Sequence, residues 1–117
     1  MPQISVDYSD GVLLDPAEFV RNLHSRVAKL IDSPVDDCKT VFRRAEEFFV
    51  GLGGPRAATV YLEIKILSGR SPEVKKRLAE EVLTLLERSA RPGPGVRAHL
   101  AVNVVEMDRD FYRKTSL

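Results

Sequence analysis

Apolar and polar residues alternate at the start of the chain. From Pro2 to Asp7 every second side chain is apolar, and the same alternation returns over residues 60–66 (VYLEIKI). A period of two is typical of a strand that buries one of its faces. Both segments are therefore predicted to be strands, with Pro2 at the very beginning of the first.

Two further segments have apolar residues at steps of three and four, which is the spacing of one helix face. The first stripe runs from Val20 to Ile31 and the second from Val74 to Leu86. Each follows a start signal, which is an N-cap residue, a proline and a glutamate, at residues 15–18 and 71–73. We predict one helix from each segment.

A breaker and then a strand follow each predicted helix. Ser33-Pro34 and the RPGPG sequence of residues 91–95 interrupt the helical spacing. Strands are predicted over residues 38–49 and 96–107, and the GLGGP sequence of residues 51–55 is predicted to form a hairpin-like turn between the halves rather than a phosphate loop.

The two halves therefore repeat one order of elements. Aligning Pro2 with Val60 gives an offset of 58 residues between the two halves. Each half is predicted to be a strand, a crossover helix and a parallel strand. We predict an α+β fold over residues 1–117, a single domain made of two β-α-β units at about 2–56 and 57–117. Its four-stranded sheet carries both helices on one face, and the other face is expected to pack on another subunit.

Composition narrows the classes of partner. The chain has 18 basic and 17 acidic residues, a net charge of +1, and 44% hydrophobic residues, so its bulk charge favours neither nucleic acid nor lipid. Its one cysteine, Cys38, excludes an intrachain disulfide, and its start lacks the pattern of a signal peptide. No apolar run approaches the ~18 residues of a spanning helix. We expect a cytoplasmic protein with no membrane and no nucleic-acid partner.

Three segments resemble the 5-carboxymethyl-2-hydroxymuconate isomerases of the tautomerase superfamily: MPQISVDYSD (residues 1–10), IKILSGRSPEVKK (64–76) and VVEMDRDFYRK (104–114). The Met-Pro start and the Gly69-Arg70-Ser71 turn are the most specific parts. The resemblance implies an amino-terminal proline that acts as acid and base, cationic residues that hold substrate carboxylates, no cofactor, and a homotrimer. It implies catalysis by Pro2 once Met1 has been removed.

The chemistry of a terminal proline agrees with that role. Inside a chain the proline nitrogen is an amide, whereas loss of Met1 would make it a secondary amine that can take and return a proton. An α-amino group titrates near 7.7–8.0, and an apolar pocket or nearby cations lower this pKa toward neutrality. The alternative is that a proline at position 2 has no special role.

Cationic residues are the candidates for substrate binding. Arg70 lies where a strand meets a helix start, so its guanidinium and the helix dipole would both favour a carboxylate. Lys39 stands where the family more usually has an arginine, and it keeps the charge but not the planar fork. Arg43 shares a strand face with Lys39, and we expect that one of the two helps Arg70 to hold a dianionic substrate. The alternatives are a solvated loop arginine at position 70 and strand charges that limit aggregation.

The remaining candidates are weaker. Phe111, with Tyr112, either lines an apolar pocket at a subunit boundary or anchors the C-terminus by packing. His24 and His99 are isolated and Cys38 has no partner, so no metal site is expected.

The predicted function is therefore keto-enol tautomerisation of a small unsaturated 2-hydroxy or 2-oxo carboxylic acid, of the kind formed in the catabolism of aromatic compounds, without metal or organic cofactor. A non-catalytic oligomeric binding or scaffold protein with the same fold is the alternative. A nucleic-acid-binding sheet is disfavoured, because the strands lack paired aromatic residues on one face with basic residues around them.

Overall fold

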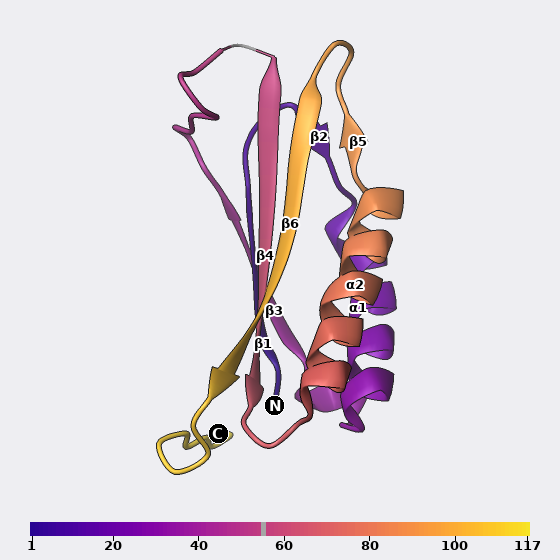
Figure 1. The fold of residues 1–117 in the computed structure, drawn as a ribbon, viewed down its shortest axis with the longest axis vertical. Helices are drawn as coiled ribbons and strands as arrows, with labels where there is room; N and C mark the ends of the chain where they lie inside the picture. The colour runs from indigo at the N-terminus through magenta and orange to yellow at the C-terminus, as the bar shows by residue number, and fades with distance from the viewer. Residues whose placement is uncertain (55) are drawn as a thin grey trace.

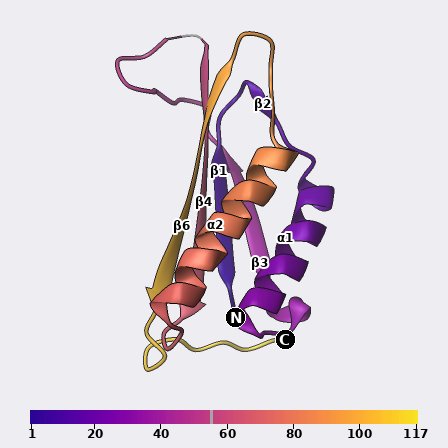
Figure 2. The same ribbon diagram turned by 45° about the vertical axis from the view of Figure 1, so that its right-hand side comes forward.

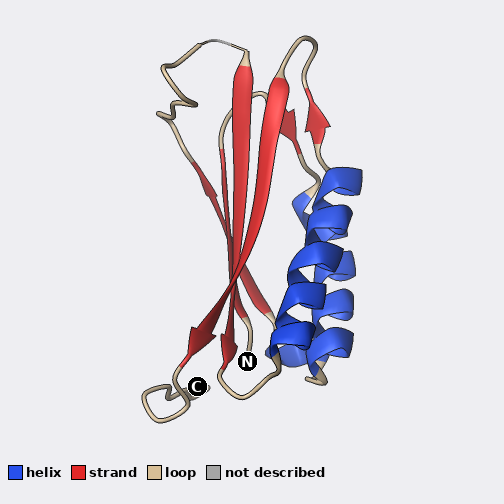
Figure 3. Cartoon of the chain, viewed as in Figure 1, coloured by secondary structure: helices blue, strands red, loops and turns tan. Residues whose placement is uncertain are grey.

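The computed structural model describes residues 1–54 and 56–117, so Pro55 of the predicted 51–55 turn lies outside the described residues. Figures 1 and 3 show one sheet with two helices beside it. The elements in chain order are β1 (Gln3–Tyr8), β2 (Val12–Leu13), α1 (Pro16–Ile31), the 3-10 helix η1 (Val35–Asp37), β3 (Lys39–Arg44), β4 (Ala57–Leu67), α2 (Pro72–Ser89), β5 (Arg91–Pro92) and β6 (Arg97–Met107).

The strand order of the main sheet is β3-β1-β4-β6. β1 runs parallel to β3 and β4 parallel to β6, whereas the central pair β1 and β4 is antiparallel. α1 and α2 cover the same face of this sheet (Figure 2), and β2 pairs with β5 in a small separate sheet. The predicted α+β fold, a four-stranded sheet with two helices on one face, is confirmed.

The core lies between the sheet and the helices. In the central pair, Ile4 lies opposite Ile64 and Val6 opposite Leu62, and all four side chains are buried. The helices contribute the matching buried side chains Phe19, Leu23, Val27, Ala28, Ile31, Leu78, Val82 and Leu86. This interdigitated layer fixes where the first residues of β1 lie, and with them Pro2.

The helix starts are capped as the sequence predicts. The Asp15 carboxylate accepts a hydrogen bond from the Glu18 amide at 3.2 Å, and the Ser71 hydroxyl accepts one from the Val74 amide at 3.2 Å. The buried stripe of α1 begins one residue earlier than predicted. Phe19, at 1% exposure, continues the four-residue spacing of the core side chains, whereas Val20 is only half-buried.

The predicted strand over residues 38–49 is too long. β3 ends at Arg44 because its partner β1 ends at Tyr8, and the Ala45 amide makes a last bond to the Tyr8 carbonyl at 2.8 Å. The next strand starts earlier than residue 60, since β6 offers Arg97 as the partner of Ala57. The length of each strand is therefore set by the strand it pairs with, rather than by the alternation of apolar and polar residues in its own sequence.

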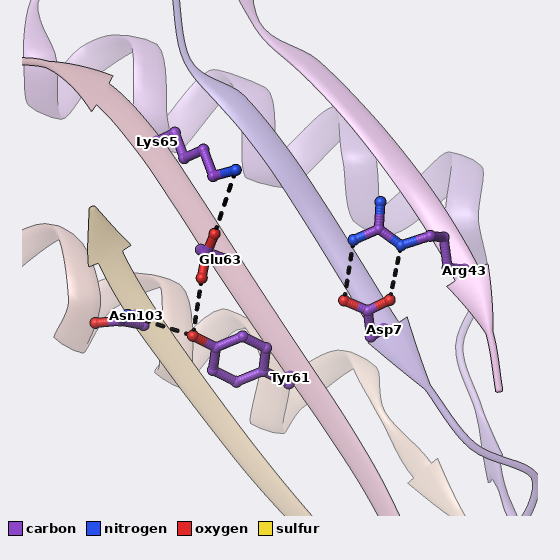
Figure 4. Close-up of polar contacts among 6 residues, drawn as sticks. All are labelled: Asp7, Arg43, Tyr61, Glu63, Lys65 and Asn103. Atoms are coloured by element: carbon purple, nitrogen blue, oxygen red, sulfur yellow. Dashed lines mark hydrogen bonds and ion pairs between the residues drawn. The ribbon is translucent and has the colours of Figure 1, made fainter. Parts of the chain in front are cut away.

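The face of the sheet away from the helices is polar with apolar residues between. Asp7 and Arg43 form a two-pronged ion pair, with oxygen-to-nitrogen distances of 2.9 and 3.2 Å (Figure 4). Beside it, the Tyr61 hydroxyl donates to Glu63 at 3.0 Å and accepts from the Asn103 amide at 3.3 Å. We call this surface the open face.

Candidate active site

A cavity of about 160 Å³ lies at the end of the sheet where β1 begins. Pro2, Arg70 and Arg109 are among its lining residues, and they come from three distant parts of the sequence. The end of α1 and η1 supply the rest of the charged lining through Asp32 and Asp37. The fold thus brings two predicted site residues, Pro2 and Arg70, to one cavity.

Pro2 is fully buried at the floor of this region, on the helix side of the sheet with Ile4. Its carbonyl accepts a hydrogen bond from the Lys39 amide at 3.2 Å, which fixes the first residue of β1 against β3. While Met1 is attached, the Pro2 nitrogen is an amide and cannot take a proton. The Met1 amine donates instead to the Ser33 hydroxyl at 3.5 Å.

The surroundings of the chain's amino group lower its affinity for a proton. Burial lowers the pKa of the Met1 amine below its usual 8.0, and the carboxylate of Asp37 partly opposes this shift. The cations of Lys39 and Lys114 act in the same direction as burial. An amine in this region therefore loses its proton more readily than one in water.

Arg70 is held by backbone carbonyls. Its Nη1 donates to the Leu67 carbonyl at 3.2 Å and its Nη2 to the Ile31 carbonyl at 3.0 Å, so it connects the end of β4 with the end of α1. A guanidinium has five N–H donors, and two bonds leave donors for an anion. Arg70 also directly precedes Ser71, the N-cap of α2, where the helix dipole favours negative charge.

Arg109 lines the cavity although the sequence analysis did not select it. It follows the end of β6, and its Nε donates to the Ser68 carbonyl across the turn that contains Gly69. Gly69 has a φ of +118°, a conformation that L side chains rarely adopt, and a Cβ there would lie 3.6 Å from Arg109 Nε. The only signal in the sequence was that Arg109 belongs to the family-like ending of residues 104–114.

Lys39 and Arg43 do not line this cavity. The Lys39 ammonium is exposed and donates to the Asp37 carbonyl at 2.8 Å, and in the register Lys39 lies opposite Gln3 on the open face. Arg43 lies at the far end of β3, where it pairs with Asp7. Within one chain neither side chain therefore lines the cavity with Pro2 and Arg70, although the Lys39 backbone amide bonds to the Pro2 carbonyl and its charge acts on the Met1 amine.

Phe111 also lies outside the cavity, with 85% of its surface exposed. Its neighbour Tyr112 folds back toward the N-terminus instead, where its hydroxyl accepts from the Gln3 side-chain amide at 3.2 Å. Lys114 comes within 3.6 Å of the Asp37 carboxylate, and Figure 2 shows the C-terminal segment crossing beneath the sheet. Residues 108–117, which we call the C-terminal tail, thus border the cavity.

A larger groove of about 610 Å³ lies between α1 and α2. Its lining mixes acidic and basic side chains, and one of them, Arg26, pairs with Glu81 on the opposite helix at 2.7 Å. Such a mixture is typical of a solvated helix surface. We therefore place the candidate site in the smaller cavity, which holds two of the predicted residues, Pro2 and Arg70.

The described residues contain no group of three or more His, Cys, Asp or Glu side chains placed as metal ligands. His24 instead shares a hydrogen bond of 2.7 Å between its Nε2 and the Thr40 hydroxyl. In the parts of the chain that the structure covers, no helix has the length and apolarity needed to cross a membrane.

No protein-family model matches the sequence, and no curated protein matches it significantly. Solved structures do match the fold. A 5-carboxymethyl-2-hydroxymuconate isomerase from Deinococcus radiodurans R1 is 22% identical, with a TM-score of 0.82 over 99% of this chain and 90% of that chain. A 5-carboxymethyl-2-hydroxymuconate delta-isomerase is 16% identical, with a TM-score of 0.69 over 99% of this chain and 88% of that one.

A fused 4-OT wild-type symmetric trimer is also similar, with 14% identity and a TM-score of 0.69 over 92% of this chain and 86% of that one. These likenesses extend over nearly the whole chain, and they agree with the resemblance seen in its sequence. The chain therefore has the α+β fold of the tautomerase superfamily, the fold of the 5-carboxymethyl-2-hydroxymuconate isomerases that it resembles.

Proposed function

We propose that the protein is a cofactor-independent keto-enol tautomerase that acts on a small unsaturated 2-hydroxy or 2-oxo carboxylic acid. One observation carries the proposal: Pro2 and Arg70, which are remote in sequence, line one cavity at the end of the sheet. The first would supply an amine and the second a carboxylate anchor. Removal of Met1 is a requirement of the proposal, because only then does the Pro2 nitrogen become basic.

In this mechanism the free Pro2 amine takes a proton from the enol hydroxyl or from an acidic carbon and returns it at the other position. The same burial that lowers the pKa of the Met1 amine would also lower the pKa of a freed Pro2 amine, which is the direction that a general base near neutral pH requires. Arg70 binds the carboxylate. Its positive charge also stabilises the electron density that develops at the 2-oxo end of the substrate during the reaction. Neither step needs a metal or an organic cofactor.

We further propose that the active form is a homotrimer in the cytoplasm, with a role in the breakdown of aromatic compounds. The open face has exposed apolar side chains such as Val41, which another copy could cover. Lys39, Arg43 and Phe111 lie outside the cavity of their own chain, so in this proposal they contribute to substrate binding only across a subunit boundary.

The test combines N-terminal mass spectrometry with an enol-to-ketone assay on a 2-hydroxymuconate-type acid. The chain that has lost Met1 should be active. The Pro2→Ala variant, whose N-terminal group is a primary amine after Met1 is removed, should have a kcat about 10²–10⁴-fold lower. The matched control is a chain with extra residues before Pro2, which keeps the Pro2 nitrogen as an amide and should be folded but inactive. Equal rates for these chains would overturn the proposal, and a folded, processed chain without turnover would favour the non-catalytic alternative.

A further inference from the structure

The cavity at Pro2 carries charges of both signs. Arg70 and Arg109 come from the turn before α2 and from the C-terminal tail, whereas Asp32 and Asp37 come from the end of α1 and from η1. The lining thus holds two arginines and two aspartates, and Lys114, which does not line the cavity, lies 3.6 Å from the Asp37 carboxylate. Met1 also lines the cavity, and its removal would enlarge the space beside Pro2 without changing any of these four side chains.

The two arginines have fixed positions. Arg70 is tied to the carbonyls of Leu67 and Ile31, and Arg109 is tied to the Ser68 carbonyl, one residue beyond Leu67. Both guanidiniums are therefore held beside the end of β4. A planar guanidinium binds a carboxylate through two parallel N–H donors, and both Arg70 and Arg109 line this cavity with N–H groups beyond those bonded to carbonyls.

The aspartates act against a second carboxylate. Asp37 lies close enough to Lys114 for an ion pair of 3.6 Å, and its charge is felt at the chain's amino group. Asp32 is exposed at the left-handed end of α1, with a φ of 53°. A substrate with a carboxylate at each end would bring its second anion near these two side chains, and like charges at close range repel each other.

We infer that this cavity selects a 2-hydroxy or 2-oxo acid with a single carboxylate, held by Arg70 and Arg109, over the corresponding dicarboxylate. This inference rests on the proposed function and departs from the dianionic substrate expected from the sequence. In this inference Arg109 raises the affinity for the single carboxylate. Asp32 and Asp37 disfavour a substrate that carries a second carboxylate at its other end.

Two enol acids with the same reacting end test this selection: 2-hydroxypenta-2,4-dienoate and 2-hydroxymuconate, which differ by one terminal carboxylate. With the full chain lacking Met1, kcat/KM should be at least about tenfold higher for the monocarboxylate. Asp37→Asn keeps the shape, removes the charge and should shift the ratio toward the dicarboxylate by about threefold or more. The ratio cancels any common effect of Asp37 on the Pro2 amine.

Arg109→Gln should raise KM for the monocarboxylate by about tenfold or more, because it removes half of the anchor. The matched control is Arg21→Gln on the outer side of α1, which removes the same charge far from the cavity and should leave KM unchanged. An unchanged KM in Arg109→Gln, or a kcat/KM ratio that equals one or favours the dicarboxylate, would overturn the inference.

Binding of unreactive analogues separates this inference from the proposed function. Pentanoate should bind the processed chain more tightly than hexanedioate in an NMR titration, and Arg109→Gln should weaken pentanoate binding. If these binding results are obtained but neither enol acid is converted, the inferred substrate class is supported and the proposed tautomerase activity is refuted. Tighter binding of hexanedioate, or no binding of either acid at millimolar concentration, would refute the substrate class.

Discussion

His24 shows how burial of a single side chain makes stability depend on pH. It is half-buried on α1, and its ring bonds to Thr40 on β3. Burial lowers the pKa of His24 below its usual 6.5, because the imidazolium loses hydration in the folded state. The unfolded chain therefore takes up this proton first as the pH falls.

The free energy of unfolding should consequently decrease as the pH falls below about 6.5 toward the lower pKa of folded His24. Urea unfolding between pH 7.5 and pH 5 measures this slope. His24→Gln keeps a hydrogen-bonding group for Thr40 but does not titrate, so its slope over this range should be smaller than that of the parent chain. A slope that is identical in the two chains would contradict the assignment of this shift to His24.

At the scale of single residues, Pro2 and Arg70 could be chosen as candidates from the sequence because each has a local signature, a chain start and a strand-to-helix turn, and the structure places both at one cavity. Arg109 could not, since its place depends on how the chain turns back after Met107. Lys39 and Arg43 share a strand face as predicted, yet the sequence does not reveal that this is the open face, opposite to the buried Pro2.

At the scale of elements, the helix starts were predictable because capping is local. The N-cap Ser71 belongs to the same turn as Arg70, so it stabilises α2 and also positions the candidate anchor. The strand ends were not predictable in this way. β3 and β4 begin and end where their partners do, and such pairing is information that a single segment of sequence lacks.

Ser71→Ala should therefore lower the free energy of unfolding by about 1 kcal/mol, because the Val74 amide loses its acceptor. Ser71→Gly should cost only a few tenths of a kcal/mol, since glycine leaves the amide open to water. Urea unfolding of the two variants gives the comparison. The role of Ser71 as a cap fails if the alanine variant is as stable as the glycine variant.

At the scale of the whole molecule, the open face has apolar side chains that a single chain leaves exposed. The Val41 side chain is 55% exposed and lies between Lys39 and Arg43 on the open face of β3, and Tyr61 is exposed on β4. The proposed trimer would cover these side chains, and burial of such apolar area favours association. The sequence could predict that one face lacks helices, but not how another copy of the chain would cover it.

Val41→Asp should accordingly break the assembly, because it would place an unpaired carboxylate in the interface. Sedimentation at micromolar concentration should show three chains together for the parent and one chain for the variant. Leu13→Asp, at a residue that is 75% exposed on β2, is the matched control and should remain assembled. A parent chain that sediments alone would remove the basis for this prediction.

The central antiparallel pair of β1 and β4 has a consequence for how the protein is made. While the ribosome has released only the first half, β1 can pair with β3 along one edge, but its other edge must wait for β4. An unpaired strand edge with Ile4 and Val6 on its buried side is prone to join other chains. The nascent chain should thus be most prone to aggregation until residues 57–67 have been made and can pair with β1.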